Sequence, residues 1–179
     1  EIFIDIPANH WAVAAIQYVY DNGLMTGVSN TEFAPEQTTT RAMIVSMLAR
    51  LENVTSAESA GFVDMSDGDW YATAVNWAAT EGIVSGTGKG DFSPNAAITR
   101  EQLAAMLMNY AAWKGEDVSV CADLSGYNDA ASVSSWAAET VQWAVAEGLI
   151  SGMPGNLLEP QGSATRAQVA AILERFLEQ

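Results

Sequence analysis

Three arginines occupy the same position of a repeated pattern, in a chain with only seven Lys and Arg residues against 22 Asp and Glu. Arg41, Arg100 and Arg166 each follow a Thr and begin a stretch with helical periodicity. The first turn of a helix carries partial positive charge, so a cation there is disfavoured by roughly 0.3–1 kcal/mol. Three arginines at such positions therefore require a compensating anion.

Two kinds of anion meet that requirement, and the residues alone leave both open. One is an internal carboxylate, because an Asp closes the short segment that introduces each repeat, at Asp5, Asp64 and Asp129. The other is an external anion, bound jointly by the guanidinium group and the amides of the helix N-terminus. The two are compatible, since a carboxylate can orient an arginine for a ligand.

A tryptophan and a glycine recur at fixed distances from each arginine. Trp11, Trp70 and Trp136 stand 30 residues before Arg41, Arg100 and Arg166, and between them lie Gly27, Gly86 and Gly152. An isolated Trp commonly packs in a core or an interface, but an aromatic face beside polar groups also holds sugar rings. The glycines permit either a positive φ in a turn or a close approach of the backbone to a ligand. Both sets are candidate ligand contacts.

The whole pattern of Trp, Gly, Gly, Pro and Thr-Arg occurs three times. Corresponding residues lie 59 positions apart between the first two copies (Arg41 to Arg100) and 66 between the last two (Arg100 to Arg166), with the seven extra residues before Trp136. We divide the chain into repeat 1 (1–57), repeat 2 (58–120) and repeat 3 (121–179). Such periodicity predicts a modular fold.

Each repeat is predicted to contain a short extended segment, a helix, a glycine-rich loop and a second helix. The second helices carry apolar residues at i, i+3, i+4 and i+7, as at Ile44, Met47, Leu48 and Leu51. Because one helix pair cannot bury its apolar faces alone, we expect an all-α fold in which three helix-loop-helix repeats pack as one pseudo-threefold assembly.

Capping residues predict where these helices begin and end. Thr40, Thr99 and Thr165 are expected to cap the second helices, and Gln102 and Gln168 to complete capping boxes in repeats 2 and 3. The first helices are expected to end at glycines in the left-handed conformation, Gly23, Gly82 and Gly148. Their expected N-caps are Asn9, Asp67 or Asp69, and Ser134 or Ser135.

Composition excludes several classes of function. The net charge of −15 argues against nucleic acid and anionic membranes as partners. No apolar run approaches the roughly 20 residues of a membrane helix, and the N-terminus lacks the basic head of a signal peptide. Cys121 is the single cysteine, and the sole His10 is expected to cap or pack a helix. With no catalytic constellation, the chain is predicted to be no enzyme and to hold no metal or cofactor.

The chain resembles three tandem S-layer homology (SLH) modules. The resemblance is carried by Gly-Leu-Met-Thr-Gly at 23–27, Gly-Ile-Val-Ser-Gly at 82–86 and Gly-Leu-Ile-Ser-Gly at 148–152, each followed by a Phe-x-Pro-like turn and Thr-Arg. It implies grooves between modules that bind a cell-wall glycopolymer, the secondary cell-wall polymer. The implied ligand is a terminal pyruvylated N-acetylmannosamine, whose carboxylate would supply the external anion.

The resemblance also implies a location and a role. It predicts non-covalent anchoring of a surface protein outside the cell, at a bacterial cell wall or S-layer, with S-layer lattice neighbours contacted through the rest of the protein. The family's Thr-Arg-Ala-Glu motif loses its final Glu in every repeat, to Met43, Gln102 and Gln168. Repeat 3 departs most, with Leu158 in place of the loop Phe, so the groove that uses this loop is expected to be the weakest.

One alternative from another class of protein remains open at this point. A helical-repeat protein that binds other proteins would show the same periodicity, with the arginines serving internal ion pairs alone. In that case no wall polymer would bind the chain.

Overall fold

The computed structural model describes residues 3–178 and shows the predicted all-α fold. The helices are α1 (Val13–Asp21), α2 (Arg41–Leu51), α3 (Ala72–Thr80), α4 (Arg100–Trp113), α5 (Ala138–Ala146) and α6 (Arg166–Leu177), with short 3-10 turns η1 (Ala130–Ser132) and η2 (Ser135–Ala137) before α5. Within residues 3–178 the only β-type pairing consists of isolated bridges.

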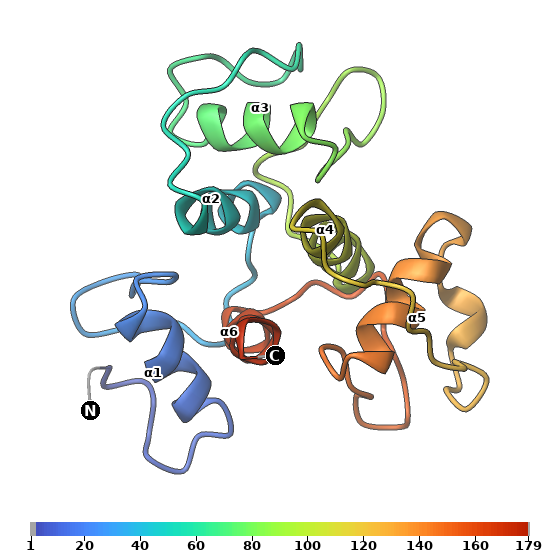
Figure 1. Ribbon diagram of the computed structural model, residues 1–179. Coiled ribbons are helices and arrows are strands. Elements are labelled where there is room, and N and C mark those ends of the chain that lie inside the picture. Colours follow the sequence, from blue (N-terminus) through green and yellow to red (C-terminus); the bar gives the residue numbers. More distant parts are fainter. Residues whose placement is uncertain (1–2, 179) are drawn as a thin grey trace.

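The second helices of the three repeats form the centre, and the first helices lie outside them (Figure 1). α2 packs against α3, α4 against α5 and α6 against α1. Each lobe therefore combines helices from two repeats, and the α6/α1 lobe joins the last repeat to the first. In the described part of the chain, the two helices of one repeat do not pack together. The repeat boundaries stay a prediction, because the packed lobes cross them.

A ring of three backbone hydrogen bonds marks the pseudo-threefold axis. The amide of Thr39 donates to the carbonyl of Ala164 at 3.1 Å, Ala164 donates to Ile98 at 3.0 Å, and Ile98 donates to Thr39 at 2.8 Å. These residues are equivalent in the three repeats and are fully buried. The ring holds the N-terminal ends of α2, α4 and α6 together.

The predicted apolar stripes and the caps of the second helices are confirmed. Ile44, Met47 and Leu48 are buried in α2, and only Leu51 is half-buried. The side chains of Thr40, Thr99 and Thr165 accept hydrogen bonds from the third amide of their helices, and both predicted capping boxes form. Gly23, Gly82 and Gly148 have the expected positive φ, at 67°, 74° and 70°.

The predicted N-caps of the first helices are wrong. These helices begin after Ala12, Tyr71 and Ala137, none of which caps through its side chain. A hydrogen-bonded backbone turn comes first, for example from Val13 N to His10 O, so the polar residues lie one turn too early. His10 does act as a local cap, because its Nδ1 accepts from the amide of Ala12 at 3.1 Å. The introductory segments at 3–5 and 62–64 are turns rather than extended chain.

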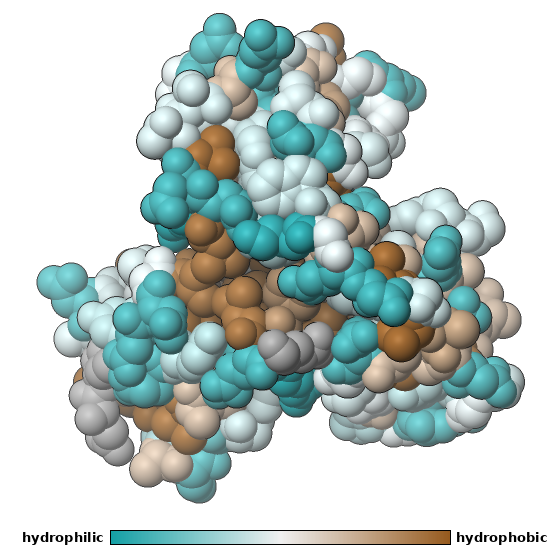
Figure 2. Space-filling model, viewed as in Figure 1, coloured by the Kyte–Doolittle hydropathy of each residue, from teal (hydrophilic) through white to brown (hydrophobic). Residues whose placement is uncertain are grey.

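The surface follows the same division between centre and lobes. Figure 2 shows apolar residues gathered near the middle of one face, around α2 and α6, while the lobes are mostly polar. The connectors 52–61 and 114–126 are largely exposed, as predicted. No helix between residues 3 and 178 is long and apolar enough to cross a membrane.

Candidate ligand-binding grooves

Each repeated arginine reaches from its own repeat into the next. Arg41 donates through Nε to the carbonyl of Phe92 and through Nη2 to that of Ser85, both at 3.0 Å. Arg100 makes the same pair of bonds to Leu158 at 2.8 Å and Ser151 at 3.0 Å. Arg166 closes the circle by binding the carbonyls of repeat 1, at Phe33 and Thr26. The three arginines thus cross-link the repeats in a ring.

The amides at the helix N-termini are already occupied, which corrects part of the anion-binding hypothesis. In α2 the amide of Arg41 donates to Ala96 O, that of Ala42 to Pro94 O and that of Met43 to Thr40 Oγ1. The corresponding amides of α4 and α6 are bound in the same way. What stays open on Arg41 is Nη1, which has no hydrogen-bond partner within residues 3–178.

The aspartates at the repeated position, Asp5, Asp64 and Asp129, hold the loops whose carbonyls bind the arginines. Asp64 accepts from the amides of Phe92 at 2.9 Å and Ser93 at 2.7 Å. Asp5 and Asp129 bind the equivalent amides of their own repeats. The second residue of each pair has a positive φ, 59° at Ser93, so the carboxylate stabilises a strained turn. The peptide fixed by Asp64 then presents the Phe92 carbonyl to Arg41.

The arginines do not form close ion pairs with these aspartates. Among residues 3–178 the ion pair within 4 Å joins Lys114 to Glu52. Burial lowers the pKa of Arg41, and the charge of Asp64 in the next repeat acts in the opposite direction. Burial likewise lowers the pKa of Arg100, against the charges of Glu159 and Asp129. Arginine keeps its proton in proteins, so these guanidinium groups stay charged. Backbone carbonyls and a more distant carboxylate therefore compensate each cation.

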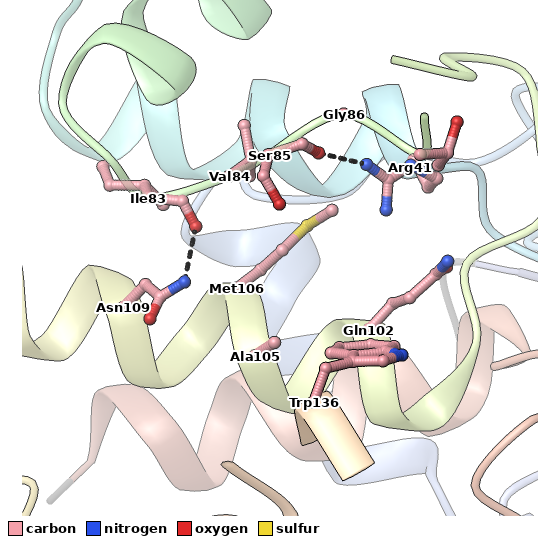
Figure 3. Close-up of a pocket in the computed structure, with 11 residues that line it drawn as sticks. Arg41, Ile83, Val84, Ser85, Gly86, Gln102, Ala105, Met106, Asn109 and Trp136 are labelled. Atoms are coloured by element: carbon pink, nitrogen blue, oxygen red, sulfur yellow. Dashed lines mark hydrogen bonds between the residues drawn. The ribbon is translucent and has the colours of Figure 1, made fainter. Parts of the chain in front are cut away.

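A cavity of about 390 Å³ adjoins Arg41 (Figure 3). We call it the Arg41 groove. Arg41 from repeat 1 lies at one end, residues 83–87 of repeat 2 form one wall, and α4 supplies Gln102, Ala105, Met106 and Asn109. Trp136 from repeat 3 lines the opposite side. All three repeats thus contribute to a single groove.

An equivalent cavity of about 390 Å³, the Arg100 groove, lies one repeat further on. It is lined by Arg100, by Leu149, Ser151, Met153 and Pro154 of the repeat 3 loop, by α6, and by Trp11 of repeat 1. The corresponding residues of the third set are Arg166, which donates to Thr26 O, and Arg50, which donates to Leu24 O. Trp70 and Arg50 also line a neighbouring cavity of about 360 Å³ between α2 and α3.

Core packing is not the role of the repeated tryptophans. Trp11, Trp70 and Trp136 are 61%, 64% and 58% exposed, although they are large apolar side chains. The cores of the lobes are instead closed by residues such as Phe33, Phe92 and Leu158, which are almost fully buried. Exposure leaves the indole rings available beside the polar groups of the grooves.

Close packing against the backbone of the same repeat requires the loop glycines of repeats 1 and 2, Gly27 and Gly86. Gly27, Gly86 and Gly152 do not have a positive φ, so the turn interpretation is wrong. A Cβ on Gly86 would lie 2.6 Å from Asp91 O and 3.0 Å from Phe62 Cε1, and one on Gly27 would lie 2.3 Å from Ser29 O. The absence of a side chain at Gly86 lets the Phe62 ring and the backbone of Asp91 pack directly against this part of the loop.

Sequence reasoning missed a set of groove residues on the second helices. Asn109 Nδ2 donates to Ile83 O at 3.1 Å, and at the same repeat position Arg175 Nη1 donates to Leu149 O at 3.4 Å and Arg50 Nη1 to Leu24 O at 3.3 Å. Each lies nine residues after its repeated arginine, as Arg50 follows Arg41. The equal spacing could have identified these residues from the sequence. It was missed because the position holds Asn109 in repeat 2 and arginine in the other two repeats.

Comparison with known families agrees with this architecture. A family model described as the S-layer homology domain matches residues 3–42, 61–104 and 126–170, one match for each repeat. The chain belongs to the S-layer homology domain family. SLH modules are non-catalytic anchoring modules of cell-surface proteins, and this SLH chain is accordingly extracellular and associated with the cell wall.

The relatives of the SLH chain include both enzymes and S-layer proteins. Over 98% of its length, the chain is 36% identical to an exoglucanase XynX of Acetivibrio thermocellus, and the match covers 16% of that enzyme. Over 98% of its length it is also 36% identical to an amylopullulanase of Thermoanaerobacterium thermosulfurigenes, of which the match covers 9%. Over 97% of its length, it is 29% identical to the S-layer protein sap of Bacillus anthracis, and the match covers 21% of that protein. The chain thus spans less than a quarter of each of these relatives, and the enzymes match only through this small part.

Proposed function

We propose that this SLH chain anchors a surface protein to the cell envelope by binding the pyruvylated terminal sugar of a secondary cell-wall polymer in the grooves between its repeats. The observation that carries the proposal is the pairing of a recessed arginine with an exposed tryptophan in two cavities, Arg41 with Trp136 and Arg100 with Trp11. A cation opposite an aromatic face suits a ring that carries a carboxylate.

The dimensions and open groups of the groove support this ligand. A cavity of about 390 Å³ has room for a monosaccharide. The free Nη1 of Arg41 is the group we assign to the ketal carboxylate, while Gln102 and the polar wall of residues 85–87 can bind ring hydroxyls. The chain itself performs no catalysis in this proposal.

The overall charge of −15 does not prevent binding of an anion. Repulsion between exposed charges is largely screened beyond about 8–10 Å at physiological ionic strength, whereas Arg41 is 4% exposed and acts at contact distance. Moderate salt should therefore leave binding intact.

The alternative is a protein-binding repeat in which the arginines have a purely structural role. To distinguish it from wall binding, the test must use substitutions that do not destabilise the fold. Arg41, Arg100 and Arg166 all cross-link repeats, so replacing them lowers stability under either function. The exposed tryptophans separate the two functions, because they line the grooves without filling the core.

The test is sedimentation of the purified chain with cell-wall preparations. We expect binding to walls that keep their polymer, loss of binding when the polymer or its pyruvate is removed, and loss in the triple variant Trp11→Ala, Trp70→Ala, Trp136→Ala. Trp113→Ala is the matched control, since Trp113 is also partly exposed but lies outside the Arg41 and Arg100 grooves. Undiminished binding to bare peptidoglycan would overturn the polymer assignment, and no binding to any wall would favour the alternative.

A further inference from the structure

The Arg41 groove has two distinct ends along the wall formed by residues 83–86. At one end Ser85 O accepts from Arg41, and at the other Ile83 O accepts from Asn109 (Figure 3). The two carbonyls are two residues apart, so at most about 7 Å separates them along the chain. That spacing is close to the span of a sugar ring with its substituents. A ligand in the groove can therefore reach both ends at once.

The inner end is the same in every groove, whereas the outer end differs in charge. The inner end is the end at the repeated arginine, Arg41 in one groove and Arg100 in the other. The outer end is neutral in the Arg41 groove, at Asn109, but holds the guanidinium group of Arg175 in the Arg100 groove. Arg175 lines the Arg100 cavity itself.

The charge of Arg175 is not needed to hold the loop. Asn109 makes the equivalent bond to Ile83 O with a neutral amide, and at 3.1 Å it is shorter than the 3.4 Å bond of Arg175 to Leu149 O. Arg175 is exposed, and within residues 3–178 it forms no ion pair and donates only through Nη1. The remaining donors of its guanidinium group are available to a ligand.

The carboxylates near the Arg100 groove act on its inner end. Asp129 corresponds to Asp64 of the Arg41 groove, and Glu159 stands where that groove has Ser93. Both interact electrostatically with Arg100. Arg175 adds a second cation at the other end of this groove.

We propose that the residue at the outer end sets the number of anionic groups that a groove accepts. Resting on the proposed function, this assigns to the Arg100 groove a sugar with two anionic groups on opposite sides of the ring, such as a ketal carboxylate and a phosphate. The Arg41 groove takes a sugar whose second group is a neutral hydrogen-bond acceptor, bound by Asn109.

The experiment uses double variants in which only one of the two grooves keeps its tryptophan. The variant Trp70→Ala, Trp136→Ala keeps Trp11 and therefore an intact Arg100 groove. The variant Trp11→Ala, Trp70→Ala keeps Trp136 and therefore an intact Arg41 groove. Each variant is titrated by calorimetry with two probes, the methyl glycoside of pyruvylated N-acetylmannosamine and the 1-phosphate of the same sugar. The first probe carries a carboxylate alone, and the second carries a carboxylate and a phosphate.

We expect the phosphate probe to bind the Arg100 groove about five- to tenfold more tightly than the methyl glycoside, as an additional charge-assisted contact at a partly exposed site predicts. Arg175→Asn should abolish that preference, and Asn109→Arg should create it in the Arg41 groove. Equal affinities for both probes in both grooves, or a preference that survives Arg175→Asn, would overturn this inference while the proposed function stands. Failure of both probes to bind any variant would refute the proposed function and this inference with it.

Discussion

The Arg41 and Arg100 grooves are built on the same backbone plan with different side chains. In both, a buried arginine binds two carbonyls of the next repeat, and the cavities are of equal size, about 390 Å³. The guanidinium carbon of Arg41 lies 4.6 Å from the centre of the Phe92 ring, whereas Arg100 meets Leu158 at that place. The backbone carbonyls therefore define the groove, and the aromatic ring adds to it.

The grooves also differ in how tightly their glycine-containing wall is packed. A Cβ on Gly86 would clash with the backbone oxygen of Asp91 at 2.6 Å. A Cβ on Gly152 would approach the Tyr127 ring at 3.1 Å and the Asn156 side chain at 3.7 Å. The repeat 3 loop departs from the pattern and leaves more freedom here. Whether its groove is the weakest stays a prediction, because the loss of the aromatic ring is accompanied by the gain of Arg175.

The largest expected effect is the loss of stability when a repeated arginine is removed. It tests whether the hydrogen bonds to the carbonyls or the contact with the aromatic ring contribute more to the stability of the groove. Arg41→Ala leaves two partly buried carbonyls without donors and removes a cation–π contact, so we expect a loss of about 3–4 kcal/mol of unfolding free energy. Arg100→Ala should cost about 1 kcal/mol less, because its cation–π contact is missing. Urea denaturation measures both, and Arg50→Ala, which removes an exposed arginine bound to a single carbonyl, is the reference for a small loss. Equal losses would show that the Phe92 ring contributes nothing.

Replacing Gly86 or Gly152, the glycines in the sides of the two grooves, is expected to give the next largest loss of stability. Gly86→Ala forces a Cβ against backbone, and we expect a loss of about 2–3 kcal/mol. Gly152→Ala should cost less than about 1 kcal/mol, since the Tyr127 ring and the Asn156 side chain can move. Gly68→Ala serves as the control, because a Cβ there meets nothing within 4 Å and φ is not positive. Thermal unfolding of the three variants checks the order, and a Gly152→Ala loss as large as that of Gly86→Ala would contradict it.

Acid should loosen both grooves to a similar extent. Although desolvation acts to raise the pKa of Asp64, amides of Phe92 and Ser93 and the charge of Arg41 lower it overall, and the pKa of Asp129 is lowered in the same way by its own loop and Arg100. A lowered folded-state pKa gives stability that is present above the unfolded pKa of about 4 and is lost as pH falls through the folded value.

The matched variants Asp64→Asn and Asp129→Asn should each cost about 1 kcal/mol at pH 7, because an amide oxygen accepts more weakly than a carboxylate. Both should flatten the fall in stability below pH 4, which urea titrations at pH 7 and pH 3 measure. A fall below pH 4 as steep as in the unsubstituted chain would show that these carboxylates do not control it.

The smallest expected change in stability belongs to the tryptophans. Trp136→Ala and Trp11→Ala remove side chains that are 58% and 61% exposed, so we expect the unfolding free energy to change by less than about 0.5 kcal/mol. Each variant should nevertheless weaken wall binding, because each removes the aromatic side of a groove. Sedimentation beside thermal unfolding separates the two quantities. A large loss of stability would mean that the indoles support the fold.

Much of the fold was predictable because the relevant signals are local. The caps Thr40, Thr99 and Thr165 and the left-handed Gly23, Gly82 and Gly148 depend on a few neighbouring residues, and all were confirmed. The N-caps of the first helices failed because an extra backbone turn separates the polar residues from the helix. Site residues proved harder, since Asn109, Arg175 and Arg50 gain a role only when a loop lies against them.

The sequence by itself determined the repeat, the helices and the requirement that each arginine be compensated, because periodicity, capping and the helix dipole act within one segment. Only the tertiary structure decided what compensates the arginines and where the grooves lie. Arg41, the 83–87 wall and Trp136 come from three different repeats, and the packing of α2 against α3 and of α4 against α5 and η2 brings them together. Contacts between distant segments follow from how the lobes pack around the axis, which the spacing within one repeat does not specify.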